Sequence, residues 1–370
     1  MFRRETRVRV LEDGALEVVD PCPEDLPLLQ TLDPTFQVQT EPLEGFNAPR
    51  LRAARQADTG LSPEDLGRVS AEDLWAVHRA PLRQIRRVGA TGPATPMVSL
   101  MDLKVELARR ALSLCRLCAR RCGVDRLNGD VGVCGLGAEA YVGEHFLHVA
   151  EEPPINPAYT LNVQGCGLRC RYCQQYRILT IDARRGEALS PDLWERLDLT
   201  GARSLSFVGG NPDESAYAIL KFLRAAPDGF ALPVVWNCHG FAEPVVLKLL
   251  AGVVDVYVPD FKYGNDRCGK IWSGVDGYVR TVRRAIRHMI AQDATILVRV
   301  LVLPGHVACC HLPALRWLTR YKNRLRLRVM GQYAPDFAVR PTDGLMAARP
   351  TPEMVEAVVA GAARLGFRLV

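Results

Sequence analysis

Residues 159–173 read YTLNVQGCGLRCRYC, an apolar run rich in β-forming residues that leads directly into a loop with three cysteines. Similar β-rich runs follow at residues 205–208, 233–238, 253–259, 296–303 and 325–330. Most of the gaps between them carry apolar residues at helical spacing, as in 215–225 and 278–289. Strand and helix alternating about six times predict a parallel sheet covered by helices. Six units are fewer than the eight of a closed barrel, so we expect an α/β fold, a partial (β/α)6 TIM-like barrel.

The loop after the first strand is a candidate site, because chemistry in such sheets lies at the carboxyl ends of the strands. The spacing of Cys166, Cys170 and Cys173 lets three thiols on a short loop face one point. Thiolates bind zinc or iron–sulfur clusters, and a closed structural zinc site needs four ligands. Three thiolates on a four-iron cluster would leave one iron free, which is a feature of catalysis. A three-cysteine zinc knuckle with a distant fourth ligand is the alternative.

This Cys-x3-Cys-x2-Cys spacing, with Tyr172 before the last cysteine, resembles the signature of the radical S-adenosylmethionine (SAM) superfamily. The resemblance implies a [4Fe-4S] cluster on the three cysteines, with Tyr172 near the cofactor and the open iron chelated by the methionine moiety of SAM. It also implies reductive cleavage of SAM to methionine and a 5′-deoxyadenosyl radical, which abstracts hydrogen from the substrate. The cofactor carries this chemistry, and the protein orients and shields it.

Two glycines follow the second strand, in the order Gly209-Gly210-Asn211-Pro212. The family usually has Gly-Gly-Glu/Asp-Pro at this place, and the resemblance implies that the glycine backbone meets the SAM amino group. Glycine permits such a close approach. Because Asn211 replaces the acidic residue, we expect its amide carbonyl to serve instead.

The ends of the third and fourth strands carry Asn237, Asp260 and Lys262. They are similar to the Asp-Thr-Asn-Gly-Phe and Asp-Leu-Lys motifs of the activating enzymes of glycyl-radical enzymes. The resemblance implies that Asn237 and Asp260 flank the methionine end of SAM, where activating enzymes hold a monovalent cation, and that Lys262 contacts SAM or substrate. Residues two apart on a strand point the same way, so Asp260 and Lys262 predict an ion pair at the barrel mouth. An ordinary surface pair is the alternative.

The fifth strand contains Arg299 within Val-Arg-Val-Leu-Val-Leu-Pro-Gly, which is close to a run in the same group of enzymes. A guanidinium in an apolar strand needs a partner. The SAM carboxylate is one interpretation, and a buried structural pair with an Asp is the other.

The most similar group is a little-characterised branch of proteins that resemble pyruvate formate-lyase activating enzyme. The shared runs are an upstream Cys-x2-Cys-x3-Cys-Gly, Glu-Glu-Pro-Pro-Ile at 151–155, Asp-Phe-Lys-Tyr-Gly at 260–264 and Leu-Pro-Gly-His at 303–306. The resemblance covers about residues 105–370.

A second group of cysteines lies upstream and consists of Cys115, Cys118, Cys122 and Cys134. Four thiolates are a complete ligand set for one metal centre, either zinc or an auxiliary [4Fe-4S] cluster. A full protein ligand set would make that centre structural or electron-relaying. Buried reduced thiols are the alternative.

Composition narrows the class of protein. Of 370 residues, 48% are hydrophobic and 24% charged, which is typical of a soluble globular chain. We expect no export signal and no transmembrane helix. Twelve cysteines without an export signal favour metal binding in the reducing cytoplasm over disulfides. The run His306-Val-Ala-Cys309-Cys310-His311 is interpreted as a polar loop, because adjacent cysteines do not easily share one metal.

The domain prediction is an accessory segment of unknown role at 1–95, a helix with the four-cysteine subdomain at 96–157, and a radical SAM partial barrel at 158–370. We expect hydrogen abstraction from a protein or peptide, with an electron donor such as flavodoxin or ferredoxin. Radical modification of a small molecule or RNA, and a non-catalytic iron–sulfur carrier, are the alternatives. Arg324, Arg326 and Arg328 alternate with apolar residues, but no interleaved aromatics favour a nucleic-acid partner.

Overall fold

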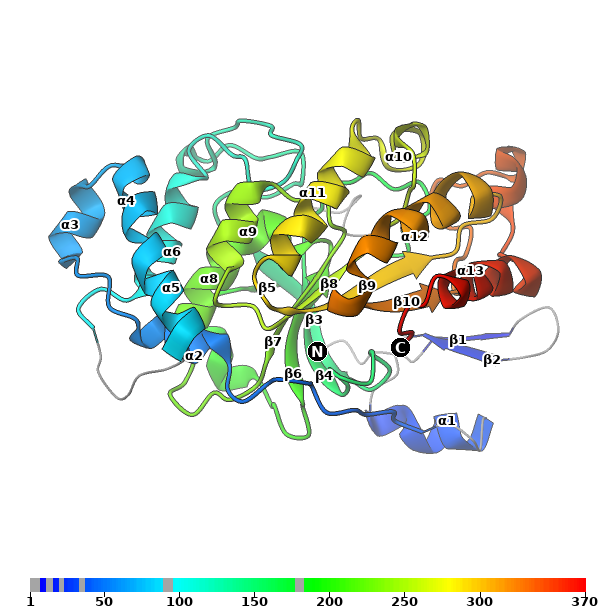
Figure 1. The fold of residues 1–370 in the computed structure, drawn as a ribbon, viewed down its shortest axis with the longest axis horizontal. Helices are drawn as coiled ribbons and strands as arrows, with labels where there is room; N and C mark the ends of the chain where they lie inside the picture. The colour runs from blue at the N-terminus through cyan, green and yellow to red at the C-terminus, as the bar shows by residue number, and fades with distance from the viewer. Residues whose placement is uncertain (1–6, 11–15, 20–22, 33–36, 89–95, 177–182) are drawn as a thin grey trace.

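The computed structural model describes residues 7–10, 16–19, 23–32, 37–88, 96–176 and 183–370. Its centre is an open sheet whose order is β10-β9-β8-β7-β6-β4-β3-β5 (Figure 1). The six parallel strands are β4 (Ala158–Val163), β6 (Ser204–Gly209), β7 (Val234–Cys238), β8 (Val256–Pro259), β9 (Thr295–Leu301) and β10 (Arg326–Met330). Each neighbours the next in chain order, so the predicted partial (β/α)6 barrel is confirmed.

Two antiparallel strands extend this sheet beyond β4 and were not predicted. The strand β3 (Tyr141–His148) pairs with β4, and β5 (Glu187–Ala188) pairs with β3. β3 is mostly half-buried or exposed, so its sequence contains Gly, Glu and His instead of a continuous apolar run. A strand near the edge of a sheet lacks the signal that marks a buried parallel strand.

Helices cover the outer face of the parallel strands (Figure 1). They are α8 (Ala216–Arg224), α9 (Pro244–Leu250), α10 (Asp266–Ser273), α11 (Tyr278–Ile290), α12 (Leu312–Leu318) and α13 (Pro352–Arg364). The stripe predicted on α11 is buried at Val282, Ile286 and Met289. The helix α9 has Pro244 at its first position, where a missing N–H costs nothing.

The described part of residues 1–95 adds a hairpin of β1 (Arg7–Val10) and β2 (Leu16–Val19) and five helices. These helices are α1 (Leu26–Leu32), α2 (Arg50–Gln56), α3 (Pro63–Arg68), α4 (Ala71–Val77) and α5 (Arg79–Val88). Ser70 caps α4, accepting a hydrogen bond from the Asp73 N–H. The proposed domain boundary at residue 95 lies outside the described residues.

The helix α6 (Leu100–Arg110) joins these N-terminal helices to the barrel. It packs against α2 and α4 on one side and against α8 and α9 on the other. The buried Lys104 connects the layers, because its Nζ lies 2.8 Å from His78 Nε2 and donates to the Leu249 carbonyl at 2.9 Å. The N-terminal segment is therefore held against the barrel by polar as well as apolar contacts. No helix in the described ranges is both long and apolar enough to cross a bilayer.

Candidate cofactor site at the open end of the barrel

One cavity of about 560 Å³ lies at the carboxyl ends of the parallel strands. Its lining includes the barrel residues that the sequence predicted to bind the cluster, SAM or substrate, namely Cys166, Cys170, Cys173, Tyr172, Gly209, Gly210, Asn211, Asn237, Asp260, Lys262 and Arg299. These residues come from the ends of four strands, β6, β7, β8 and β9, and from the cysteine loop that follows β4. The structure therefore brings the predicted site residues together around one space, within the size range of ligand pockets.

The cysteine loop is seated on the end of β6 through backbone contacts. The Asn211 N–H donates to the Gly165 carbonyl at 2.9 Å, and the Gly210 N–H donates to the Val163 carbonyl at 2.8 Å. A Cβ atom at Gly210 would lie 2.0 Å from the Gly165 carbonyl oxygen, which is far inside contact distance. Gly210 is thus required by the close crossing of the two loops.

A chain of hydrogen-bonded hydroxyl groups, from Ser273, Tyr263 and Tyr172, contacts the cysteine loop at Cys170. Cys170 Sγ lies 2.9 Å from Ser273 Oγ, Ser273 Oγ lies 2.7 Å from Tyr263 Oη, and Tyr263 Oη lies 2.6 Å from Tyr172 Oη. Burial raises the pKa of Cys170, and the neighbouring Lys262 ammonium partly offsets the rise. Burial disfavours the thiolate of the free protein, but a metal centre replaces the thiol proton. Cys170 would therefore coordinate such a centre as a thiolate.

Asp260 and Lys262 form the predicted ion pair at the mouth of the cavity. Lys262 Nζ lies 2.6 Å from Asp260 Oδ2, and the Lys262 N–H donates to Tyr278 Oη at 2.8 Å. The side chains are only 15% and 25% exposed, so this is not the ordinary surface pair. Burial lowers the pKa of Lys262, but the Asp260 carboxylate more than compensates, and the net shift is upward. The ammonium group therefore stays charged inside the cavity.

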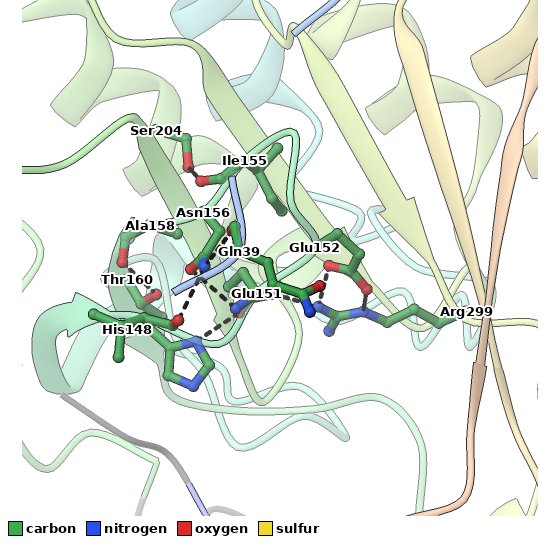
Figure 2. A network of polar contacts seen from close by, with 11 residues as sticks. Gln39, His148, Glu151, Glu152, Ile155, Asn156, Ala158, Thr160, Ser204 and Arg299 are labelled. Atoms are coloured by element: carbon green, nitrogen blue, oxygen red, sulfur yellow. Dashed lines mark hydrogen bonds and ion pairs between the residues drawn. The ribbon is translucent and has the colours of Figure 1, made fainter. Parts of the chain in front are cut away.

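Arg299 reaches from β9 to two glutamates that precede β4 (Figure 2). Its Nε and Nη2 donate to the two carboxylate oxygens of Glu152, each at 2.7 Å, and Nη2 also contacts Glu151. Asn156 fixes the turn, accepting from the Glu151 N–H at 3.1 Å and donating to the Gln39 carbonyl at 2.9 Å. Burial alone would raise the pKa of Glu152, but Arg299 lowers it. The structure thus favours the buried ion pair, with glutamates where the sequence suggested an aspartate.

Both polar atoms of the Asn211 side chain form hydrogen bonds with other residues of the protein. Its Oδ1 accepts a hydrogen bond from the His239 N–H at 3.0 Å, and its Nδ2 donates to Glu214 Oε2. In the structure this carbonyl faces a backbone N–H, and its expected role at the cofactor stays a prediction. In contrast, Nδ2 of the buried Asn237 has no hydrogen-bond partner among the described residues.

Glu214 is a buried residue of the site that sequence reasoning missed. Its Oε1 accepts a hydrogen bond of 2.7 Å from the Gly167 N–H, one residue after the first cysteine of the loop, and lies 3.5 Å from His239 Nε2. It sits in a short 3-10 turn, Pro212–Ser215, directly after the glycine pair. The adjacent acids of Asn-Pro-Asp-Glu were the available signal, because two carboxylates next to a buried strand end need internal partners.

The four-cysteine group lies directly beside this loop. A Cβ atom at Gly167 would lie 3.1 Å from Cys118 Sγ and 2.5 Å from Glu214 Oε1. Burial, and then the Glu214 carboxylate, raise the pKa of both Cys118 and Cys166. The two cysteine groups are therefore neighbours that share one buried carboxylate.

The four cysteines of this upstream group converge around a loop that a buried arginine holds. Both Cys134 Sγ and Cys122 Sγ lie near Gly132, at 3.2 and 3.5 Å from the position of a Cβ atom there. Arg126 Nη1 lies 3.7 Å from Cys115 Sγ and donates to the Glu214 carbonyl at 2.8 Å. The guanidinium thus places a positive charge next to the thiols and ties their loop to the barrel.

Comparison with known proteins agrees with this geometry. Residues 163–318 match the model of the Radical SAM superfamily, so the chain carries a domain of that superfamily. The chain is 29% identical over 292 residues to "Uncharacterized protein MJ0674" of Methanocaldococcus jannaschii, which covers 76% of this chain and 84% of that protein.

Two solved structures are also similar to this chain. The crystal structure of Streptococcus suis SuiB matches at 12% identity with a TM-score of 0.35, covering 57% of this chain and 47% of that one. Native anSMEcpe with bound AdoMet and Cp18Cys peptide matches at 13% identity with a TM-score of 0.39, covering 54% of this chain and 56% of that one. The matched region is thus about half the length of each solved chain.

The match of residues 163–318 to this superfamily supports an enzyme and implies a [4Fe-4S] cluster and SAM as cofactors. The residues present fit these groups. Three thiols line one cavity with Gly209, Gly210, a charged lysine and the amide nitrogen of Asn237, which has no hydrogen-bond partner in the part of the chain that the structure describes.

Proposed function

We propose that this protein is a radical SAM enzyme that abstracts hydrogen from a protein or peptide, in the manner of an activating enzyme. The observation that carries the proposal is the gathering of three thiols of one loop, a glycine pair and the Asp260–Lys262 ion pair around one cavity. When bound, the cluster and SAM supply a 5′-deoxyadenosyl radical through reductive cleavage of SAM.

The residues of the chain have separable tasks in this proposal. Cys166, Cys170 and Cys173 hold the cluster, and the hydroxyl chain that ends at Tyr172 keeps their loop in place. The backbone at Gly209 and Gly210 meets the amino group of SAM. Lys262 Nζ, held by Asp260, and Asn237 Nδ2 offer donors to an anionic group in the cavity. Because an amide nitrogen does not bind a cation, Asn237 favours an anion on its side of the cavity.

A protein or peptide substrate is supported by the rim of the cavity. Tyr176 and Phe337 stack with ring centroids 5.4 Å apart next to the cysteine loop, and Phe337 is 43% exposed. Gln174 lines the cavity and donates to the Gln332 carbonyl at 3.2 Å. An exposed aromatic ring beside polar amides is suited to contact with an extended polypeptide segment.

A small anionic molecule is the second candidate substrate, because one basic residue of β10 faces the cavity. Arg328 lines it and donates from Nη1 to the Val370 carbonyl at 3.0 Å. The other two arginines of the alternating run do not line the cavity: Arg326 pairs with Glu41 and Glu44, and Arg324 pairs with Asp293. One guanidinium is enough to bind a carboxylate or phosphate.

The function is tested by reconstituting the protein with iron and sulfide without oxygen and measuring 5′-deoxyadenosine with dithionite. The wild type is expected to form it, and Cys170→Ala is not. A non-catalytic iron–sulfur carrier would bind iron but form no 5′-deoxyadenosine. Substrate class is tested by incubation with a glycyl-radical protein, which should become oxygen-sensitive, against incubation with small anionic metabolites, which should not change in mass.

We also propose that Cys115, Cys118, Cys122 and Cys134 hold an auxiliary [4Fe-4S] cluster that relays electrons from a donor such as flavodoxin or ferredoxin. The position of a Cβ atom at Gly167, one residue after Cys166, lies 3.1 Å from Cys118 Sγ, which gives a short path to the first site. This proximity favours an electron-relaying cluster over a structural zinc ion.

The second centre is tested by replacing Cys118 with Ala and counting iron and zinc after reconstitution. A loss of about four iron atoms per chain, with the first cluster's spectrum retained, is the expected result. Loss of zinc at unchanged iron would assign the site to zinc instead.

A further inference from the structure

A third group of metal-binding side chains lies on the rim of the barrel, outside both cysteine groups described above. Cys268 is in the first turn of α10, and His306 and Cys309 belong to the turn that follows β9. One ligand atom from each of these three residues lies within 4.8 Å of the other two, the only such group in the described part of the chain. The sequence suggested a polar loop at residues 306–311, because adjacent cysteines do not easily share one metal. Cys268 is remote in the chain and was not connected with that run.

The His306 ring is held in the orientation that a metal ligand needs. Its Nδ1 lies 2.7 Å from the Pro304 carbonyl oxygen, so this nitrogen carries the proton in the neutral ring. Nε2 is then the nitrogen with a free lone pair. A histidine that donates one ring N–H to a backbone carbonyl is the usual arrangement at metal sites, because the hydrogen bond fixes the tautomer.

The cysteines are held by hydrogen bonds of Asn265. Its Oδ1 accepts from the Cys268 N–H at 2.8 Å, and its Nδ2 donates to the Cys309 carbonyl at 2.9 Å and to Cys310 Sγ at 3.3 Å. Cys268 also lies at the amino-terminal end of α10, where the helix dipole favours a thiolate. The buried Cys310 places its Sγ 3.7 Å from that of Cys309, next to the ligand group.

We propose that Cys268, His306 and Cys309 bind one zinc ion, independently of the cluster chemistry proposed above. Two thiols and one imidazole form a soft to borderline donor set, which suits zinc and not a hard cation such as magnesium. On binding, the two thiol protons are released to solvent and both sulfurs coordinate as thiolates. The fourth position is taken by Cys310 or by water, since Cys309 is exposed.

The proposed ion would join α10 to the turn after β9, and α10 contacts the loop that carries the first three cysteines. The His306 ring packs edge-on against Trp272 with centroids 6.0 Å apart, and the Arg171 guanidinium lies 4.9 Å from the centre of the Trp272 ring. The Arg171 N–H donates to the Trp272 carbonyl at 2.8 Å, and Arg171 follows Cys170 directly. A zinc ion at this position would fix α10 to the turn after β9, and through Trp272 it would stabilise the loop that carries the first three cysteines.

The test is metal analysis of the protein whose other seven grouped cysteines are already occupied by iron–sulfur clusters. After incubation with one equivalent of zinc and desalting, the wild type should retain about one zinc per chain. Cys268→Ser and Cys309→Ser should each lose it, while His288→Gln on α11 retains it. In protein loaded with cobalt(II), the thiolate-to-metal absorption should weaken in the same two variants. Circular dichroism verifies that each variant is folded.

Three outcomes would overturn the zinc site. The first is a wild type that retains no zinc. The second is zinc that disappears in Cys118→Ala but stays in Cys268→Ser, which places the ion at the four-cysteine loop. The third is a disulfide between Cys268 and Cys309 in protein kept under reducing conditions. Because the readouts are zinc content and cobalt absorption, failure here leaves 5′-deoxyadenosine formation as an independent result.

Discussion

Glu214 Oε1 accepts a hydrogen bond from the Gly167 N–H at 2.7 Å, and through this bond a buried carboxylate holds the loop that carries Cys166. The same carboxylate accepts from Asn211 and lies 3.5 Å from His239 Nε2. It also lies close enough to Cys118 and Cys166 to raise the pKa of both, after burial itself. Glu214 therefore connects the strand end at β6 with both cysteine groups.

Replacing Glu214 with Ala should destabilise the protein, because the buried donors Gly167 N–H and Asn211 Nδ2 lose their acceptor and His239 loses its neighbouring carboxylate. We expect a loss of about 3–5 kcal/mol in the free energy of unfolding, measured by urea denaturation. Glu214→Gln retains an acceptor and should lose about 1–2 kcal/mol. Asp198→Ala, at an exposed loop, is the control and should change stability by less than about 0.5 kcal/mol. Equal effects of Glu214→Ala and Asp198→Ala would contradict this role.

Gly210→Ala should displace the cysteine loop, because the new Cβ would lie 2.0 Å from the Gly165 carbonyl oxygen. We expect a loss of about 1–3 kcal/mol or more of stability and reduced iron incorporation at the first site. Gly229→Ala is the matched control, since no atom lies within 4 Å of a Cβ there. Thermal unfolding and iron content of the reconstituted protein measure both effects, and a Gly210→Ala protein with normal iron content would count against the close crossing.

Arg299→Met should leave Glu151 and Glu152 buried without their guanidinium, at a cost of about 3–5 kcal/mol at pH 7. In the wild type Arg299 holds the pKa of Glu152 below 4.5, so this carboxylate contributes stability that is present above about pH 4.5 and lost at lower pH. In the variant, burial raises the pKa of Glu152, and its protonation relieves the unpaired charge. The stability deficit should therefore shrink between pH 7 and pH 4.5.

Urea unfolding of both proteins at several pH values measures this deficit. Arg324→Met removes an exposed pair with Asp293 and should show almost no deficit at any pH. A deficit of Arg299→Met that stays constant between pH 7 and pH 4.5 would show that the two glutamates do not depend on the guanidinium.

His78 should make the protein sensitive to mild acid. Burial, together with Lys104 and Lys248, lowers its pKa to about 2, while the unfolded chain titrates near 6.5. Below pH 6.5 the unfolded state therefore binds a proton that the folded state does not, and stability falls by up to about 1.4 kcal/mol per pH unit. His78→Gln can still accept a hydrogen bond from Lys104 and removes this proton. Its unfolding midpoint should fall less steeply between pH 6.5 and pH 5, and identical slopes would refute the assignment.

Lys262→Met should reduce 5′-deoxyadenosine formation, because the cavity loses its ammonium group and Asp260 loses its partner. A charge-assisted hydrogen bond of about 1.5–3 kcal/mol corresponds to a fall of about 10- to 100-fold in rate. Lys270→Met is the control, since its pair with Asp276 is exposed on α10. Unchanged product formation in Lys262→Met would remove this lysine from the proposed machinery.

The sequence alone predicted the six parallel strands and the helices around them. It also predicted that the cysteine loop, the glycine pair and the Asp260–Lys262 pair lie together at one edge of the sheet. The physical reason is that the spacing of apolar residues, which marks helices and strands, is a local property of the sequence. Parallel strands also place their carboxyl ends at the same edge of the sheet, independently of how the side chains pack. The spacing of residues on one strand also predicted the ion pair of Asp260 with Lys262.

Only the tertiary structure decided which polar groups became partners. Arg299 lies 147 residues from Glu152, Glu214 lies 47 residues from Gly167, and Cys268 meets His306 across two loops. Such pairings depend on which loops the folded barrel brings together, and no local pattern encodes them. The half-exposed strand β3 was not predicted for a related reason. A strand near the sheet edge forms because it pairs with its neighbour, here β4, and its own sequence need not contain an apolar run.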